Sequence, residues 1–187
     1  MYHIDQHQHH LSWDNSIPPI ITINSGEIVT FNCLDASNGQ INAQSTDEVK
    51  LKLWKLDENN YQYAWFKQNQ IRISHRPFTG ECSVARSLNG SFSTILPYRT
   101  GENIDTKCLI KGAKLYLPME CKGALFSIGD EHAAQGDREV CGTTIETPII
   151  VSVRLTVRHG DEFKHVTSPC LLTQPDIKQS TQYLFGF

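Results

Sequence analysis

The segment 129–142 concentrates residue types that carry acid–base and metal chemistry. Between its three glycines lie acidic side chains, a histidine, a glutamine and a cysteine. Asp130 and His132 are two positions apart, so an extended backbone directs both side chains to one face. A carboxylate and an imidazole on one face can ligate a divalent metal, or act as a base and its orienting group. Solvated turns have the same composition, so the residue types alone leave a site and a plain loop as alternatives.

Cys141 offers a second chemistry in the same segment. A thiol becomes a nucleophile when a neighbouring base takes its proton, and His132 and Glu139 are the bases within reach along the chain. A cysteine that precedes a glycine at the start of a strand is also typical of a small buried hydrophobic residue. Both interpretations stand at this point.

Strands are the elements expected to position these groups. Residues 149–158 alternate most clearly, with Ile149, Val151 and Val153 on one face and polar residues on the other. Further strands are predicted at 20–23 and 28–31 (a hairpin), 49–54, 70–73, 114–117 and 124–128. The acidic segment then becomes a loop at a sheet end, where a rigid scaffold can present polar groups.

The pattern predicts a mainly β fold, a β-sandwich with little helix, because no helical period extends over a useful window. The 187 residues divide into a polar, His-rich N-terminal segment at 1–14 and one β-rich domain at 15–187. The histidines of the first segment are explained by a mobile polar N-terminus, and the alternative is that His9 or His10 reaches the site.

The composition of the chain indicates which classes of partner and which cell compartment to expect. A net charge of −3 without a basic stripe argues against nucleic acid. No apolar run approaches the roughly 20 residues that cross a bilayer, and no signal peptide is evident, so a cytoplasmic protein without a membrane partner is expected. The six cysteines include no C-x-x-C pair, which favours free thiols over a structural zinc site.

One long stretch carries a family resemblance. Residues 123–146, GALFSIGDEHAAQGDREVCGTTIE, resemble the signature of the acetamidase/formamidase family. Further pieces follow in the family's order, at 13–19, 34–41, 76–80, 101–105 and 115–118. The resemblance covers most of the chain and is strongest from Arg99 to Arg158.

The resemblance implies a mainly β enzyme that hydrolyses a short aliphatic amide of the formamide or acetamide type to a carboxylate and ammonia. The preferred hypothesis is metal-activated water, with zinc as the first expectation and with three ligands: Asp105, Asp130 and His132. The candidate catalytic residues are Glu139 as general base, Cys141 as the nucleophile of an alternative route, and Glu146. Asn103 and Gln135 are predicted to bind the substrate amide.

Two substitutions depart from the family pattern. Glu102 replaces the second glycine of Gly-Gly-Asn-Met-Asp, where a turn needs positive φ. Arg138 replaces a small residue in Gln-Gly-Asp-Gly-Glu, and its charge is expected to lower the pKa of Glu139 or to fill substrate space.

The chain is also shorter than the members of the family that it resembles. It lacks a block between Thr46 and Lys50, and it stops where the family continues into a helical C-terminal region. The alternative function is therefore a catalytically impaired, truncated paralogue that acts as a small-amide-binding or subunit-interaction domain. A homo-oligomer is expected, with the apolar end at 184–187 as a candidate contact.

Overall fold

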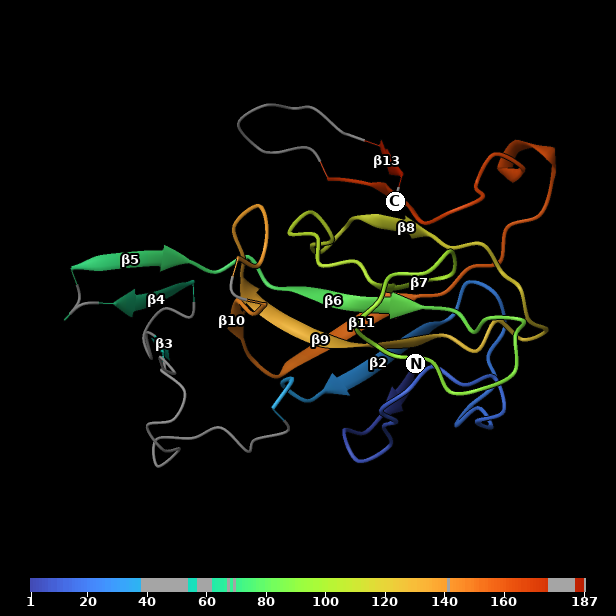
Figure 1. The fold of residues 1–187 in the computed structure, drawn as a ribbon, viewed down its shortest axis with the longest axis horizontal. Coiled ribbons are helices and arrows are strands. Elements are labelled where there is room, and N and C mark those ends of the chain that lie inside the picture. Colours follow the sequence, from blue (N-terminus) through green and yellow to red (C-terminus); the bar gives the residue numbers. More distant parts are fainter. Residues whose placement is uncertain are drawn as a thin grey trace.

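The computed structural model describes residues 1–37, 54–56, 62–66, 68, 70–140, 142–174 and 184–186. Nearly all of its regular structure is β-strand, and a 3-10 helix at Asp161–Phe163 adds a single turn. Within the described residues, no helix has the length and apolarity that crossing a membrane requires. The strands of the described residues form four sheets, whose arrangement Figure 1 shows.

The central sheet contains four antiparallel strands. Their order is β10 (Ile145–Glu146), β9 (Ser127–Ala134), β6 (Phe78–Ser83) and β7 (Gly101–Asn103). β6 and β9 run through the middle of the molecule (Figure 1). This sheet carries most of the polar residues singled out in the sequence.

A second sheet packs against it. β2 (Ile28–Cys33) lies between β1 (Tyr2–Ile4), which is parallel to it, and β11 (Ile149–Arg154), which is antiparallel. Val29, Phe31 and Cys33 point inward from β2 and form the core. The ring of Phe31 lies 5.9 Å from that of Phe126, just before β9, so the two sheets share apolar side chains.

Two smaller sheets complete the molecule. One has the order β13 (Leu184–Gly186), β12 (Cys170–Leu172) and β8 (Lys114–Tyr116). The other has the order β3 (Lys55–Leu56), β4 (Tyr63–Phe66) and β5 (Ile71–Ser74), and it projects to one side in Figure 1. The mainly β fold class, with little helix, is thereby confirmed.

Four predicted strands are confirmed, because β2, β5, β8 and β11 lie within or close to the ranges expected at 28–31, 70–73, 114–117 and 149–158. The hairpin from 20–23 to 28–31 is wrong: residues 20–23 form no strand. Both edges of β2 are taken by β1 and β11, so residues 20–23 have no edge of β2 to pair with. Ile21 and Ile23 pack their side chains against the core instead. Of the predicted strand 49–54, only Trp54 lies within the described residues.

The strand predicted at 124–128 begins later and runs further. Ala124 and Leu125 have φ of 60° and 54°, a left-handed conformation that excludes them from a strand. β9 therefore starts at Ser127 and continues to Ala134. Asp130 and His132 consequently lie in a strand of the central sheet, and the prediction that they lie in a loop was wrong.

Candidate active site and metal centre

His132 is the hub of the polar cluster. Its side chain is 0% exposed, and its ring packs 4.6 Å from the ring of Phe78 on the neighbouring strand. The Nε2 atom lies 3.0 Å from Asp130 Oδ2 and 3.8 Å from Asp105 Oδ1. The three residues predicted as metal ligands therefore meet at one ring nitrogen.

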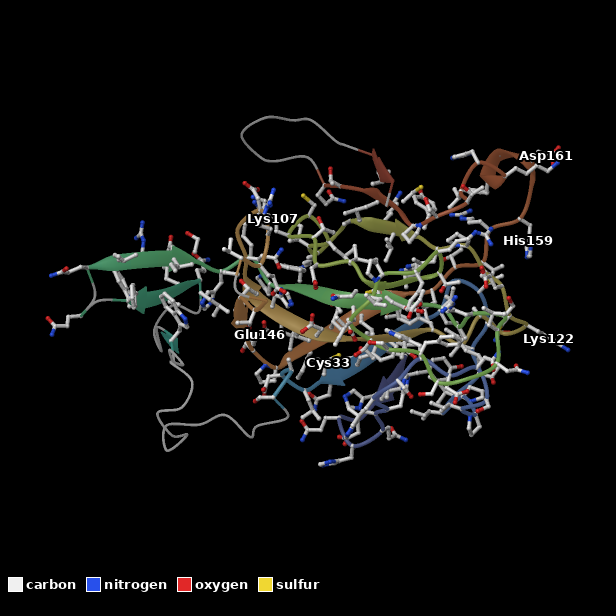
Figure 2. All side chains as sticks on the ribbon, in the orientation of Figure 1. Cys33, Lys107, Lys122, Glu146, His159 and Asp161 are labelled. Carbon is white, nitrogen blue, oxygen red and sulfur yellow. The ribbon has the colours of Figure 1, made fainter. Side chains whose placement is uncertain are left out.

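Two further carboxylates approach the same imidazole. Glu139 Oε1 lies 3.9 Å from Nδ1 of His132, and Glu146 Oε2 lies 3.8 Å from Nε2. The other oxygen of Glu146 accepts hydrogen bonds from the Thr143 hydroxyl at 3.0 Å and the Thr144 N–H at 3.2 Å. Figure 2 shows Glu146 on β10, at the edge of the central sheet. The structure thus adds two acids to the predicted ligand set.

Strained backbone brings the two aspartates together. Asp130 has φ of 54° inside β9, and Asp105 has φ of 42° just after β7. The N–H groups of Ile104 and Asp105 both donate to the carbonyl of Gly80 on β6, at 3.0 and 3.2 Å. This turn places Asp105 over β6, beside Asp130. Backbone strain of this kind concentrates at functional sites.

Gln135 connects the histidine to the Asp105 backbone. Its Nε2 donates to the Asp105 carbonyl at 2.7 Å, and its Oε1 lies 2.9 Å from Nδ1 of His132. A carbonyl only accepts, so the amide NH₂ must face Asp105 and the amide oxygen must face the imidazole. Nδ1 of His132 therefore carries a proton and donates it to Gln135, while Nε2 faces the aspartates.

Burial and crowding of like charges raise the pKa values of the acids. Burial, with the charges of Asp130 and Glu139, raises the pKa of Asp105 to about 7. Burial also raises the pKa of Glu139, which corrects the expectation that Arg138 lowers it; Arg138 is exposed. Burial opposes the charged form of His132, but the hydrogen bond and charge of Asp130 outweigh burial and raise its pKa to about 9.

Three buried oxygens in this cluster have no hydrogen-bond partner among the described residues: Asp105 Oδ1, Glu139 Oε1 and Glu146 Oε2. Each is the oxygen that faces His132. Two groups of potential ligand atoms result, Asp105–Asp130–His132 and His132–Glu139–Glu146, each with its atoms within 4.8 Å of one another. One imidazole with several carboxylates suits a divalent cation, so the donor set fits a metal.

One known protein family matches the greater part of this chain. The model of the Acetamidase/Formamidase family matches residues 67–186, more than half of the chain. This chain belongs to the acetamidase/formamidase family.

Individual relatives match over shorter stretches. A formamidase of Methylophilus methylotrophus is 43% identical over an alignment of 77 residues, which covers 35% of this chain and 19% of the relative. An acetamidase of Mycolicibacterium smegmatis is 38% identical over 56 residues, which are 29% of this chain and 14% of the relative. The chain thus spans less than a fifth of the length of these two relatives.

Solved structures of the family share the fold. The predicted acetamidase/formamidase of Thermoanaerobacter tengcongensis superposes with a TM-score of 0.80 at 21% identity, over 92% of this chain and 73% of the other. The acetamidase of Bacillus halodurans gives 0.79 at 20% identity, over 91% of this chain and 74% of the other.

The two remaining predicted site residues of this family member are Asn103 and Cys141. Asn103 donates from Nδ2 to the carbonyl of Ile95 at 2.9 Å, and its Oδ1 is buried without a hydrogen-bond partner in the described part of the chain. Cys141 lies outside the described residues, so its role as a nucleophile stays a prediction.

Glu102, which replaces a glycine of the family pattern, has the positive φ expected at this position. Glu102 has φ of 85°, the left-handed conformation that its replaced glycine would adopt without strain. Its carboxyl is 0% exposed, and neither oxygen has a hydrogen-bond partner within the described chain. Burial raises the pKa of Glu102 to about 7.

Sequence reasoning missed Gly80 and Glu81 on β6. Burial, followed by the charges of Asp130 and Asp105, raises the pKa of Glu81 to about 8, so this acid belongs to the same cluster. A glycine beside an acid inside a buried strand is a usable signal, because strand glycines often mark close approach of another group. In the sequence, Gly80 stood out only as the end of the family piece 76–80, and Glu81 lies just outside that piece.

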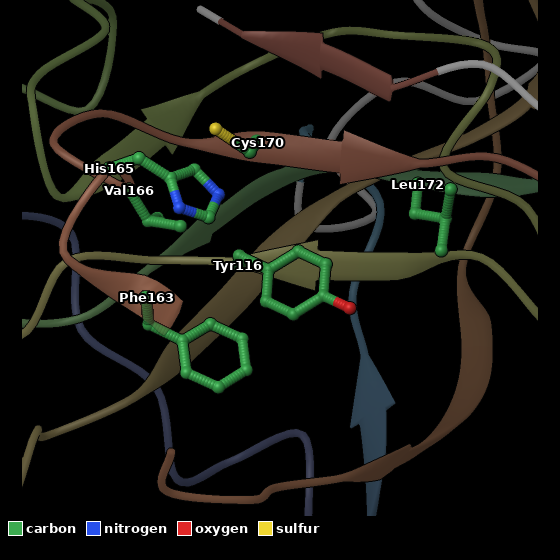
Figure 3. A pocket seen from close by; sticks show the side chains of 6 residues that line it. All are labelled: Tyr116, Phe163, His165, Val166, Cys170 and Leu172. Carbon is green, nitrogen blue, oxygen red and sulfur yellow. The ribbon is translucent and has the colours of Figure 1, made fainter. Parts of the chain in front are cut away.

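An apolar pocket lies elsewhere. Its volume is about 200 Å³, and its lining consists of Tyr116, Phe163, His165, Val166, Cys170 and Leu172. Figure 3 shows these side chains around β8 and β12. No carboxylate lines it and it shares no residue with the His132 cluster, so it is not part of the candidate site.

Proposed function

We propose that this chain hydrolyses a short aliphatic amide, of the formamide or acetamide type, to a carboxylate and ammonia. The observation that carries the proposal is a set of carboxylate oxygens, on Asp105, Glu139 and Glu146, that face the buried His132 and have no hydrogen-bond partner among the described residues. Family membership and the names of its relatives, formamidase and acetamidase, support this substrate class.

Asp105, Asp130 and Nε2 of His132 are the residues that would hold a divalent metal, with zinc as the first choice. When bound, such an ion lowers the pKa of water to about 7 and so supplies a nucleophile at neutral pH. The proton on Nδ1 of His132, donated to Gln135, leaves Nε2 directed at the aspartates. Gln135 thus serves the site by orienting His132.

Glu139 is assigned the proton transfers. Amide hydrolysis needs a base for the attacking water and an acid for the departing nitrogen, because an amide anion is a poor leaving group. Burial raises the pKa of the half-buried Glu139 toward neutral pH. A carboxyl with such a pKa can both accept a proton from water and donate one to the departing nitrogen. Glu146, anchored by Thr143 and Thr144, holds its second oxygen toward the same imidazole.

Asn103 is proposed to bind the substrate. Its buried Oδ1 lacks a hydrogen-bond partner within the described residues, and an amide N–H of the substrate is a donor of the right type.

The decisive experiment measures metal content by mass spectrometry and ammonia release from formamide, acetamide and propionamide on one purified sample. We expect bound metal, ammonia release that chelation abolishes, and a loss of at least about 100-fold in kcat for Glu139→Gln. The exposed Glu162 gives the matched control, because Glu162→Gln should release ammonia at the wild-type rate.

The same assay separates the other interpretations. Activity that survives chelation and is lost on treatment with iodoacetamide, or in Cys141→Ala, would replace the metal route with the cysteine route. No release with any added metal would leave the small-amide-binding or subunit-interaction domain. Light scattering on the eluting protein tests the proposed homo-oligomer; the backbone of β13, within the expected contact, already pairs with β12.

A further inference from the structure

Gly80 lies at the one break in the pairing between β6 and β9. The strands pair through Thr79↔Glu131 and again through Glu81↔Gly129, while Gly80 and Asp130, which face each other between these pairs, are not paired. Asp130 has φ of 54° at this point. The break lets the Asp130 side chain lie over the β6 backbone.

The two aspartate carboxylates occupy the space that a side chain at position 80 would need. A Cβ atom on Gly80 would lie 2.9 Å from the Asp130 carbonyl oxygen and still closer to two carboxylate oxygens, at 2.5 Å from Asp105 Oδ1 and 2.6 Å from Asp130 Oδ2. Real Cβ atoms essentially never come within 3.0 Å of a heavy atom from elsewhere in the chain. These are the same two oxygens that face Nε2 of His132.

The need for glycine here is one of space. Gly80 is absent from the described glycines that have positive φ, so alanine fits its backbone conformation. Its carbonyl also accepts the N–H groups of Ile104 and Asp105, which fixes the turn that delivers the Asp105 carboxylate. The Gly80 carbonyl and the absence of a Cβ on Gly80 therefore both help to place the Asp105 carboxylate.

We propose that Gly80 is a positioning residue of this site: the absence of a Cβ lets the Asp105 and Asp130 carboxylates converge on Nε2 of His132. The link to metal binding rests on the proposed function, whereas the convergence itself is independent of any metal.

The first test compares Zn²⁺ affinity by calorimetry in Gly80→Ala and Gly136→Ala. Displaced carboxylates should weaken Zn²⁺ binding by about 10–100-fold, the usual effect of losing support behind metal ligands. Gly136 is the matched control, because its Cβ would meet nothing within 4 Å and its φ is not positive. Equal Zn²⁺ affinity in wild type and Gly80→Ala would overturn the proposal.

The second test uses metal-free protein and therefore tests the role of Gly80 even if the wild-type protein binds no Zn²⁺. A wild-type protein that binds no Zn²⁺ would contradict the proposed function and leave the role of Gly80 open to this test. Gly80→Ala should lower Tm by about 4 °C or more, as overpacking does. In a background with Asp105→Gly and Asp130→Gly, which removes both carboxylates and tolerates positive φ, the loss should fall below half. A Gly80→Ala variant that folds only in this background supports the proposal equally. An equal loss of Tm in both backgrounds, or failure to fold in both, would overturn it.

Discussion

At the scale of single residues, the two ring nitrogens of His132 make different contacts. Nδ1 donates to Gln135, which is held in turn by the Asp105 carbonyl, and Nε2 faces two carboxylates. A histidine that ligates a metal typically has this arrangement, with the second nitrogen donating to a fixed acceptor. Gln135 therefore determines which nitrogen faces the acids, and its predicted contact with the substrate amide stays a prediction.

Replacing Gln135 tests this role. Gln135→Leu removes both the acceptor for Nδ1 and the donor to Asp105, so Zn²⁺ affinity should fall about 10–100-fold. Gln135→Glu keeps an acceptor for Nδ1 and should recover part of that loss. Calorimetry measures both affinities, and the ¹⁵N shifts of His132 report which nitrogen is protonated. Asp137→Asn is the control, because Asp137 is exposed and pairs with Lys107. If Gln135→Leu binds Zn²⁺ like wild type, Gln135 does not orient the histidine.

At the scale of elements, β9 supplies the site because it is held from both sides. It pairs with β6 and β10 within its sheet, and β2 packs across one face. Phe31 on β2 contacts Phe126 immediately before β9. The position of His132 thus depends on a core that contains none of the polar groups.

Truncating that core should therefore affect stability and the site together. Phe31→Ala should lower the free energy of unfolding by about 3–5 kcal/mol, the typical loss for a buried phenylalanine. We expect Zn²⁺ affinity to fall as well, because β9 loses support. Denaturant unfolding and calorimetry measure the two effects. Ile150→Ser, on the outward face of β11 where Ile150 is 68% exposed, should change stability by less than about 0.5 kcal/mol. Unchanged Zn²⁺ affinity in folded Phe31→Ala would show that the site is independent of this packing.

The sequence predicts some of these elements well and others poorly, for physical reasons. β11 was found because it alternates along its length, and one face of a strand is readable without knowing its partners. The false strand at 20–23 has equally good β-branched residues, but pairing depends on which edges of β2 remain free. The closeness of Asp130 and His132 followed from local spacing. The contributions of Gly80 and Glu81 depend on β6 lying beside β9, which no local pattern reveals.

At the scale of the whole molecule, the crowded carboxylates around His132 lower the stability of the folded protein when no metal is bound. Several carboxylates surround one imidazole in a buried place, and burial raises the pKa of Asp105 to about 7, above its usual 3.8. A buried acid with a raised pKa binds its proton more tightly in the folded state, so stability falls as pH rises from about 4 to about 7. Above pH 7 the folded protein carries the full cost of the charged Asp105 carboxylate unless a metal ion is present.

Asp105→Asn should therefore reverse its effect on stability when metal is added. In metal-free protein at pH 8, the variant should have a higher Tm than wild type, because it removes one buried charge; near pH 4 the two values should agree. With Zn²⁺ at 100 times its Kd, wild type should gain about 2.7 kcal/mol while the variant, short of a ligand, gains less. Thermal unfolding at both pH values, with and without Zn²⁺, measures all four conditions. If the variant stays the more stable protein when Zn²⁺ is present, or if the metal-free proteins show no difference at pH 8, then the acids around His132 do not compete in the way described.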